Sequence, residues 1–408
     1  VPVILNNDGT VSKAGQGSTP ITEVIPKGNF TTINPSVQYL TGAFDPNGTN
    51  TFVLAFKDGN SGNRGACVVG TVSGTTITFG SQAVFETTNA GYIDISYDPN
   101  NAGTFIVVWH SGSTGRARVG TVSGTTITFS GNYSTFNTSR ADYNKVSFDP
   151  NTAGRFVLAY RSITSVPSLG TVIIGNVSGT TITFGSKYVI PGAAGFGHYI
   201  GAVDWDPYTA NRFALCYSNG GQSARGEIRL GTVTGTSVSF SAYSPFTTGS
   251  VGSSQSFAFD PTTANRFLVI YSDSANSNYG TAVIGTISGL ASTISYGTPV
   301  VYASSSSPIR DMSFDTNTPD KFLLFYRDVN NSNYATAIVS TIVGTDISFG
   351  SPYLVNTSNS ADQAIFFNPN THGQFVAGLW SADHSSGQAV IGQMGSSISL
   401  DSNLTSNN

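Results

Sequence analysis

Apolar residues alternate with small or polar ones before an acidic or amide residue at several points along this chain. In "KVSFDPNTAGRF", Val146 and Phe148 are bulky and apolar, whereas Lys145 and Ser147 are polar. Side chains that alternate with a period of two point to opposite faces of a β-strand. The pattern predicts a strand with one face packed between apolar neighbours and the other turned toward a polar, crowded space.

This pattern occurs seven times, at intervals of about 54 residues, and a fixed period of this size is typical of repeat architectures. The positions two and four residues before the acidic or amide residue are mostly small or polar, although one of them is Phe366. We call the acidic or amide residue that ends each copy its anchor residue. The anchors are Asp45, Asp98, Asp149, Asp206, Asp260, Asp315 and Asn368.

A second phrase, such as "VGTVSGTTITFGS" from Val69, follows each anchor by some 25 residues. Each unit then holds four runs rich in Val, Ile, Thr, Phe and Tyr, separated by Asp-Pro-Asn, Ser-Gly or Gly-Ser, which is typical of strands joined by tight turns. No helical period is present. The sequence predicts an all-β fold, a seven-bladed β-propeller of four-stranded antiparallel blades with about 54 residues per repeat.

Two parts of the chain are expected, an N-terminal extension over residues 1–35 and a propeller over residues 36–408. The extension contains "GSTPITEVI" from Gly17, which is similar to outer-strand sequence in the first repeat. It either completes the last blade beside "SSISLDSN" from Ser396, which would close the ring, or serves as an anchor. An open ring would leave two sheet edges exposed.

The low charge of the chain excludes some partners. Charged residues make up 10%, the net charge is −4, and the 18 Lys and Arg residues are scattered, so nucleic acid is not an expected partner. No apolar run is long enough to insert into a membrane. Cys67 and Cys216 fall in distant repeats and are expected to be reduced, buried and structural.

The residue types give little support for catalysis. The anchor aspartates are expected to start turns by accepting backbone N–H groups, rather than to act as acids. The four histidines are dispersed and no paired Cys or His spacing appears, so we expect no metal and no cofactor. "SYDPNNAGTF" from Ser96 has a passing likeness to the Asp-box of sialidases, but the Gly comes too late. We therefore expect a protein that is not an enzyme, with a sialidase-like glycan hydrolase as a minor alternative.

Two sets of residues are candidates for a site. Channel-lining positions are Asp94, Lys145, Asp204 and Asp311, for which ion pairs or solvated groups are the alternative to ligand binding. The Asp-Pro-Asn and Ser-Gly turns should share one face, so the variable loops of the opposite face are the expected recognition surface. There we nominate as binding residues, against the alternative of unconstrained loops, Tyr92, Arg140, Asp142, His198, Tyr199, Arg310 and Asp362.

The fifth and sixth units carry "IYSDSANSNYGTAVIGTISG" from Ile270 and "FYRDVNNSNYATAIVSTIVG" from Phe325. This style resembles tail-fibre-like repeats in virion proteins of marine and cyanobacterial tailed phages, and similar repeats occur in bacterial surface proteins. The resemblance implies an extracellular structural or adhesive role and assigns no site residue.

We accordingly expect a non-enzymatic, extracellular or virion protein that displays a propeller for attachment to a host-surface glycan. The alternatives are a purely architectural virion protein, such as a capsid decoration, and a lectin-like bacterial surface adhesin. Expected partners are other virion proteins, a host glycan, or both, with multiple copies in a symmetric assembly.

Overall fold

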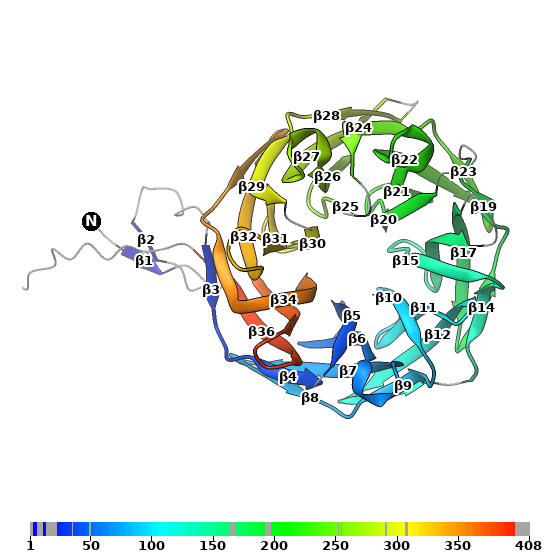
Figure 1. Ribbon diagram of the computed structural model, residues 1–408, viewed down its shortest axis with the longest axis horizontal. Coiled ribbons are helices and arrows are strands. Elements are labelled where there is room, and N and C mark those ends of the chain that lie inside the picture. Colours follow the sequence, from blue (N-terminus) through cyan, green and yellow to red (C-terminus); the bar gives the residue numbers. More distant parts are fainter. Residues whose placement is uncertain are drawn as a thin grey trace, which may run out of the picture.

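The computed structural model describes residues 3–5, 11–13, 23–34, 36–48, 50–129, 131–163, 168–191, 197–251, 253, 255–289, 292–306 and 309–395. The described residues form strands, short 3-10 turns and loops, and most strands belong to six large antiparallel sheets arranged around a central axis (Figure 1). An all-β fold was predicted and is confirmed.

Five of these sheets have the same order, in which three long strands are followed by two short segments. In the first sheet, β8 (Thr76–Phe79) and β9 (Ala83–Glu86) pair with two successive stretches of the same edge of β7 (Arg64–Ser73). The two segments act as one interrupted outer strand, so each sheet is four strands wide. The two inner strands of this sheet are β5 (Val37–Phe44) and β6 (Thr51–Asp58).

The next four sheets repeat this order along the chain. The second contains β10 (Ala90–Tyr97), β11 (Thr104–Ser111), β12 (Thr114–Ser123), β13 (Thr126–Phe129) and β14 (Ser134–Asn137). The third contains β15 (Arg140–Phe148), β16 (Arg155–Ile163), β17 (Leu169–Ser178), β18 (Thr181–Phe184) and β19 (Tyr188–Val189). The fourth contains β20 (His198–Trp205), β21 (Arg212–Asn219), β22 (Arg225–Thr234), β23 (Ser237–Phe240) and β24 (Ser244–Ser250). The fifth contains β25 (Gln255–Phe259), β26 (Arg266–Asp273), β27 (Tyr279–Ser288), β28 (Thr293–Tyr296) and β29 (Val300–Ser306).

The sixth sheet has nine strands, because β34 (Tyr353–Phe367) runs without a break from one group of strands into another. Its first part pairs with β32, and its second part, from Ser360, pairs with β35. The other strands are β30 (Ile309–Phe314), β31 (Lys321–Asp328), β32 (Tyr334–Val343), β33 (Asp346–Phe349), β35 (Gln374–Ser381), β36 (Ser386–Gly395), β3 (Glu23–Pro26) and β4 (Thr31–Asn34). The described residues therefore contain six large sheets where seven blades were expected.

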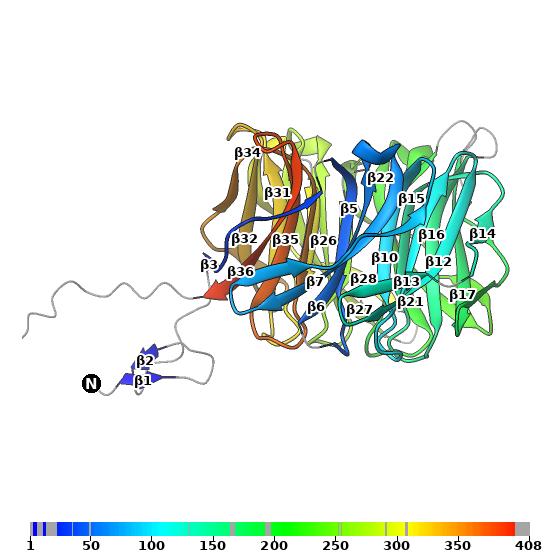
Figure 2. The same cartoon turned by 90° about the horizontal axis from the view of Figure 1, so that it is seen from below.

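The N-terminal segment joins the last strands of the chain. β3 and β4 pair with successive stretches of β36, as β8 and β9 do with β7, so strands from opposite ends of the sequence share one sheet (Figure 1). The expected partner from Ser396 onward lies outside the described residues. A separate hairpin, β1 (Val3–Leu5) with β2 (Val11–Lys13), lies outside the ring (Figure 2).

The predicted alternation along the innermost strands is confirmed by burial. Phe44, Phe148 and Phe259 are buried between sheets, whereas Ser147 remains partly exposed. Phe366, which was expected to face the axis, is instead buried against Phe44 and Phe52. It occupies space left by Gly42, where an added Cβ would lie 2.4 Å from the Phe366 ring. The one small residue at an apolar position is thus compensated by a large one in the adjacent sheet.

The anchor residues form the turns predicted for them. In the third repeat, Asp149 is fully buried and its Oδ1 accepts the N–H of Asn151 at 2.8 Å. The turn before the outer strand lies beside this one, because Val177 N–H donates to the carbonyl of Gly154 at 2.8 Å. Both uniform turns therefore share one face of the ring, as predicted. Cys67 and Cys216 are buried and unbridged.

Candidate binding site at the mouth of the central cavity

A central cavity of about 560 Å³ runs between the innermost strands of the sheets. Its lining includes all four predicted channel residues, Asp94, Lys145, Asp204 and Asp311. Asp94, Lys145 and Asp311 precede their anchors by four residues and Asp204 precedes its anchor by two, so all four side chains point to the same face of their strands. The sequence alternation therefore located the cavity wall correctly.

The cavity carboxylates bind the backbone of the neighbouring innermost strand. Asp94 Oδ2 accepts the N–H of Val146 at 2.9 Å, and Asp311 Oδ2 accepts the N–H of Ile365 at 2.9 Å. Lys145 Nζ lies 4.0 Å from Asp94 Oδ1. These contacts satisfy backbone donors that the innermost strands cannot pair within their own sheets.

Burial opposes the charge of these groups. It raises the pKa of Asp311 to about 6 despite the N–H of Ile365, and it raises the pKa of Asp204 to about 6 despite the N–H of Phe259. Burial also raises the pKa of Asp94. The Asp204 contact, Oδ2 to the N–H of Phe259, measures 3.0 Å. Each of these cavity carboxylates thus uses one oxygen to accept a backbone N–H group.

A β-bulge interrupts the first three innermost strands at the mouth of the cavity, six residues before each anchor. The residues there are Tyr39, Tyr92 and Tyr143, with φ of 52°, 49° and 55°. This left-handed conformation is favourable for glycine and costs a bulky residue roughly 1–3 kcal/mol. Asp362 holds the same position in the seventh repeat with φ of 46°, so the conformation belongs to the bulge, and in three repeats the bulge carries a tyrosine ring at the mouth.

The rings form a continuous row along one side of the mouth. Ring centroids are 5.3 Å apart for Tyr39 and Tyr92, 4.7 Å for Tyr92 and Tyr143, and 5.1 Å for Tyr143 and Tyr199. We call these four residues the tyrosine row. Tyr39, Tyr92 and Tyr143 also line the cavity, so the row offers aromatic surface at its entrance.

Side chains from the second strands support the tyrosine row from behind. Lys57 Nζ lies 5.8 Å from the Tyr39 ring centroid, and the His110 and Tyr92 rings are 5.5 Å apart. The Arg161 guanidinium lies 4.7 Å from the Tyr143 ring and 4.8 Å from the Tyr199 ring. Such cation–π contacts contribute about 0.5–2 kcal/mol each and hold the rings in place.

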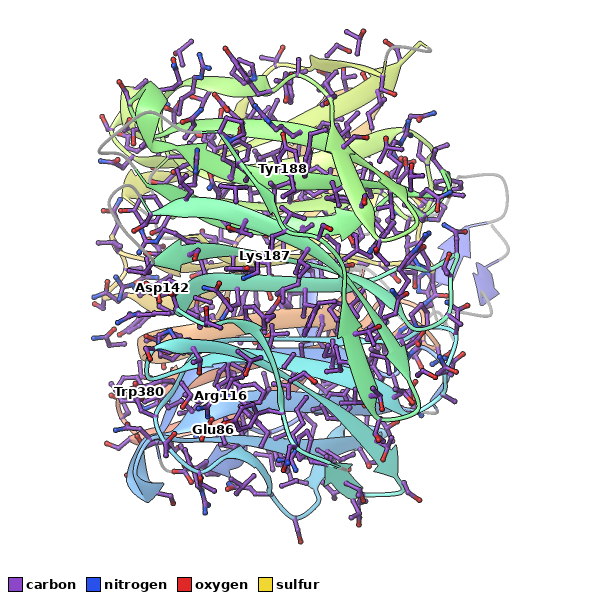
Figure 3. The ribbon with its side chains drawn as sticks, turned by 90° about the vertical axis from the view of Figure 1, so that its right-hand side faces the viewer. Glu86, Arg116, Asp142, Lys187, Tyr188 and Trp380 are labelled. Atoms are coloured by element: carbon purple, nitrogen blue, oxygen red, sulfur yellow. The ribbon has the colours of Figure 1, made fainter. Side chains whose placement is uncertain are left out.

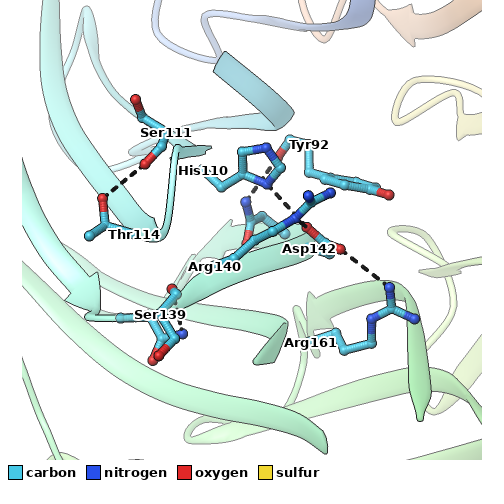
Figure 4. A network of polar contacts seen from close by, with 10 residues as sticks. Tyr92, His110, Ser111, Thr114, Ser139, Arg140, Asp142 and Arg161 are labelled. Carbon is cyan, nitrogen blue, oxygen red and sulfur yellow. Dashed lines mark hydrogen bonds and ion pairs between the residues drawn. The ribbon is translucent and has the colours of Figure 1, made fainter. Parts of the chain in front are cut away.

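Asp142 is the centre of a buried polar network beside the row (Figure 4). Its Oδ1 contacts His110 Nδ1 at 3.1 Å and accepts from Arg140 Nε at 2.7 Å, while Oδ2 accepts from Arg161 at 3.2 Å. Burial alone would raise the pKa of Asp142, but the hydrogen bonds from His110 and the arginines lower it to about 2. Asp142 is therefore a permanent carboxylate that fixes both arginines.

A second carboxylate network lies outside the cavity, around Glu86 (Figure 3). Glu86 Oε2 accepts from Trp109 Nε1 at 3.0 Å and from Arg116 at 2.5 Å. Burial would raise the pKa of Glu86, but hydrogen bonds from Thr88, Trp109 and Arg116 lower it to about 2. This network joins adjacent sheets and is structural.

Four of the nominated binding residues come together at the mouth, namely Tyr92, Arg140, Asp142 and Tyr199. Asp362 also belongs there, because its Oδ1 accepts the N–H of Tyr39 at 2.9 Å. His198 does not belong to this surface. It is completely buried, its Nδ1 accepts the N–H of Gly170 at 3.1 Å, and burial lowers its pKa to about 4. The side chain of Arg310 lies outside the described residues.

Sequence reasoning missed Tyr39, Tyr143 and Arg161. The signal for the first two was present, because tyrosine stands six residues before the anchor in each of the first three repeats. The alternation of apolar and polar residues covers only the four residues before the anchor, so it does not include this position. Arg161 stands twelve residues after its anchor, and no single residue type marks this position, which is occupied in the other repeats by Lys57, His110, Ser218, Ser272, Arg327 and Trp380.

Buried amides lie next to the tyrosine row. Asn144, Gln255 and Gln363 line the cavity and are 2%, 5% and 5% exposed. The amide groups of Asn144 and Gln255 donate to the carbonyls of Tyr92 at 3.0 Å and Tyr199 at 2.9 Å. Within the described residues, the side-chain oxygens of all three have no hydrogen-bond partner, and neither does Gln363 Nε2.

Among the described residues, no three His, Cys, Asp or Glu side chains are grouped so that they could hold a metal ion. The described part of the chain also contains no helix of the length and apolarity that crossing a membrane requires.

Comparison with solved structures identifies the fold. The WD40 domain of coronin from Toxoplasma gondii is similar with a TM-score of 0.60 at 9% identity, over 92% of this chain and 86% of that chain. The chain has a β-propeller fold. A protein from Lactobacillus plantarum is similar with a TM-score of 0.55 at 11% identity, over 87% of this chain and 95% of that chain.

Sqt1 from Chaetomium thermophilum, solved bound to the N-terminus of ribosomal protein L10, gives a TM-score of 0.55 at 14% identity, over 90% of this chain and 89% of that chain. Identities this low show the propeller fold alone. No family model matches the sequence, and no curated protein is similar to it.

Proposed function

We propose that this propeller is a non-enzymatic binding protein that attaches to a host-surface glycan through the mouth of its central cavity. The tyrosine row carries this proposal. Three of its members hold an unfavourable backbone conformation at the same position of successive strands, and strain of this kind concentrates at functional sites. Aromatic rings beside fixed polar groups are well suited to the apolar faces and hydroxyl groups of a sugar.

We infer that the ring has seven blades, counting the nine-stranded sheet as two. The support is the pairing of β34, whose first part completes the outer edge of β32 and whose second part is the inner neighbour of β35. In the other sheets these two roles belong to separate strands. Each repeat of the sequence then corresponds to one blade.

The protein's setting is proposed to be a virion or another extracellular surface. The support is the resemblance of the repeats to tail-fibre-like phage proteins, together with the position of the β1–β2 hairpin. Figure 3 shows Asp142 toward one face of the ring and the hairpin beyond the other. Attachment to other virion proteins through the β1–β2 hairpin would leave the mouth displayed toward a host, in multiple copies.

A binding role accounts for the Asp142 carboxylate better than hydrolysis does. A general acid must hold a proton near neutral pH, whereas the pKa of Asp142 is lowered to about 2 by its partners. Asp204 and Asp311 have raised pKa values, but each uses an oxygen to accept a backbone N–H of the next sheet. We assign these carboxylates to structure.

An array of immobilised host-type glycans tests the proposal, with the purified protein as probe. We expect dose-dependent binding to a subset of glycans and no released sugar when the eluate is examined by mass spectrometry. Release of sugar would replace the proposal with the hydrolase alternative. Absence of binding to any glycan, with capture of a peptide segment instead, would favour a protein partner, as the Sqt1 complex illustrates for another propeller.

A further inference from the structure

We propose that the cavity receives the terminal unit of a glycan end-on and selects an uncharged sugar over an acidic one. This inference rests on the proposed function and adds the class of ligand and its direction of entry. It depends on the order in which aromatic, amide and carboxylate side chains follow one another from the mouth inward.

That order is set by position along the innermost strands. The tyrosines at the bulge stand six residues before the anchor, Asn144, Gln255 and Gln363 stand five before it, Asp94 and Asp311 stand four, and Asp204 stands two. Successive residues of a strand advance about 3.3 Å. A ligand that enters past the tyrosine row therefore meets the amides first and the carboxylates next.

The amides supply hydrogen-bonding capacity that the described residues do not use. Asn144 and Gln255 are oriented by their donations to the carbonyls of Tyr92 and Tyr199, which leaves their oxygens as acceptors. Gln363 has both its oxygen and its nitrogen without a partner in the described chain. Gly201 makes room for Gln255, because an added Cβ would lie 2.3 Å from the Gln255 Cγ. A buried polar group gains most when a ligand hydroxyl pairs with it.

Charge decides between neutral and acidic sugars. Among the described residues, the cavity wall holds the carboxylates of Asp94, Asp204 and Asp311 and one ammonium group, that of Lys145. At the mouth, Arg140 and Arg161 share the carboxylate of Asp142, and a second carboxylate, Asp362, accepts the N–H of Tyr39. These four groups carry no net charge together, so they leave the negative charge of the cavity wall in place. A carboxylate on the incoming sugar would therefore be repelled, and like charges act more strongly in a confined cavity than in water.

The test uses saturation-transfer NMR and titration at pH 7 with defined probes. Neutral probes are the methyl glycosides of glucose, galactose and N-acetylglucosamine, and acidic probes are glucuronic acid and N-acetylneuraminic acid. We expect at least one neutral probe to bind, and both acidic probes to bind about tenfold more weakly or not at all.

Gln363→Leu tests the role of the amides. Because neither amide atom has a partner in the described chain, this variant should be at least as stable as the parent while binding the neutral probe about tenfold more weakly. Gln388→Leu is the matched control, since Gln388 is also buried with an unpartnered oxygen but does not line the cavity. It should leave binding unchanged.

Three outcomes would overturn the inference. Tighter binding of an acidic probe, or unchanged binding in Gln363→Leu, would contradict the ligand class or the entry path while leaving glycan attachment intact. Failure of every saccharide probe and of the glycan array together would remove the proposed function and this inference with it.

Discussion

Tyr92 shows how a single residue links backbone conformation to function in this propeller. Its φ of 49° lies in the region that glycine adopts freely, at a bulge where glycine would remove the strain. The ring nevertheless packs between Tyr39 and Tyr143, with His110 behind it. The aromatic surface at the mouth is therefore held in place at a cost in backbone energy.

The raised pKa of Asp204 predicts how the stability of the folded protein depends on pH. Its pKa is about 6 in the folded protein and about 4 in an unfolded chain, so the folded state binds the proton more tightly. The stability contributed by this group is complete below pH 4 and is lost as the pH rises through 6. Asp204→Asn should therefore match the parent at pH 4 and exceed it at pH 7 by about 1 kcal/mol, after allowance for solvent screening in the cavity.

Urea unfolding of both proteins at pH 4 and pH 7 measures this difference. Ser147→Ala is a suitable control, because it removes the hydroxyl that donates to Asp204 Oδ1 at 3.3 Å without removing the carboxylate. A parent protein that is more stable than Asp204→Asn at pH 7 would show that the charge is needed to bind the Phe259 N–H.

At the scale of the strands and turns, the anchor turns join neighbouring sheets in two ways. The residue five positions after each anchor always has positive φ, and it is Gly, Asn or Asp. Where the next sheet has Gly, the anchor accepts its N–H directly, as Asp98 Oδ2 does from Gly154 at 2.9 Å. Where the next repeat has Asn or Asp at this position, the residue six positions after the anchor is Arg or Gln. The arginines donate to the side-chain oxygen of that Asn or Asp.

These observations predict that an arginine-bridged contact can be replaced by a direct contact to a glycine N–H only if the Arg and the Asn are changed together. Arg212 donates to Asp206 in its own turn and to Asn265 Oδ1 of the next sheet at 2.5 Å. Arg212→Thr should lower the free energy of unfolding by about 2–4 kcal/mol, because the buried Asp206 carboxylate loses its partner. Adding Asn265→Gly should recover about 1 kcal/mol or more, because a glycine N–H can then approach Asp206.

A double-mutant cycle with the Asn265→Gly single variant isolates this coupling. Unfolding free energies that simply add would mean that the two kinds of link do not depend on matched residues in adjacent sheets. Positive coupling would mean that the order of the repeats around the ring is fixed by the anchor turns.

Across the whole molecule, the ring is joined where the two ends of the described chain meet. β3 and β4 complete the outer edge of β36 within the last sheet, and Asn368 Nδ2 of the last repeat donates to Asn50 Oδ1 of the first repeat at 2.9 Å. The pairing of β3 and β4 with β36 matches the pairing of β8 and β9 with β7 in the first sheet. A closed ring is a rigid support on which the mouth can keep its strained tyrosines.

Much of this organisation was predictable because it repeats. The alternation before Asp149 and the turn that follows it occur in every unit, so the strands, the uniform face and the cavity wall followed from the sequence. The continuous β34 was not predictable, because no break in the sequence marks whether one strand passes between two groups. His198 was misplaced for a related reason, since burial of a loop-flanking residue depends on the neighbouring strand β17 rather than on the repeat.

The measurement that tests the central claim most directly compares attachment by variants on the two faces of the ring. Tyr143→Ala and Tyr199→Ala alter the mouth, whereas Thr75→Ala and Thr125→Ala alter the uniform turns, and all four are checked first for an unchanged melting temperature. Binding to host cells or to the glycans selected on the array is then titrated. We predict a loss of at least tenfold for the mouth variants and no change for the turn variants. Intact binding in the mouth variants with loss in the turn variants would show that the protein recognises its partner through the opposite face.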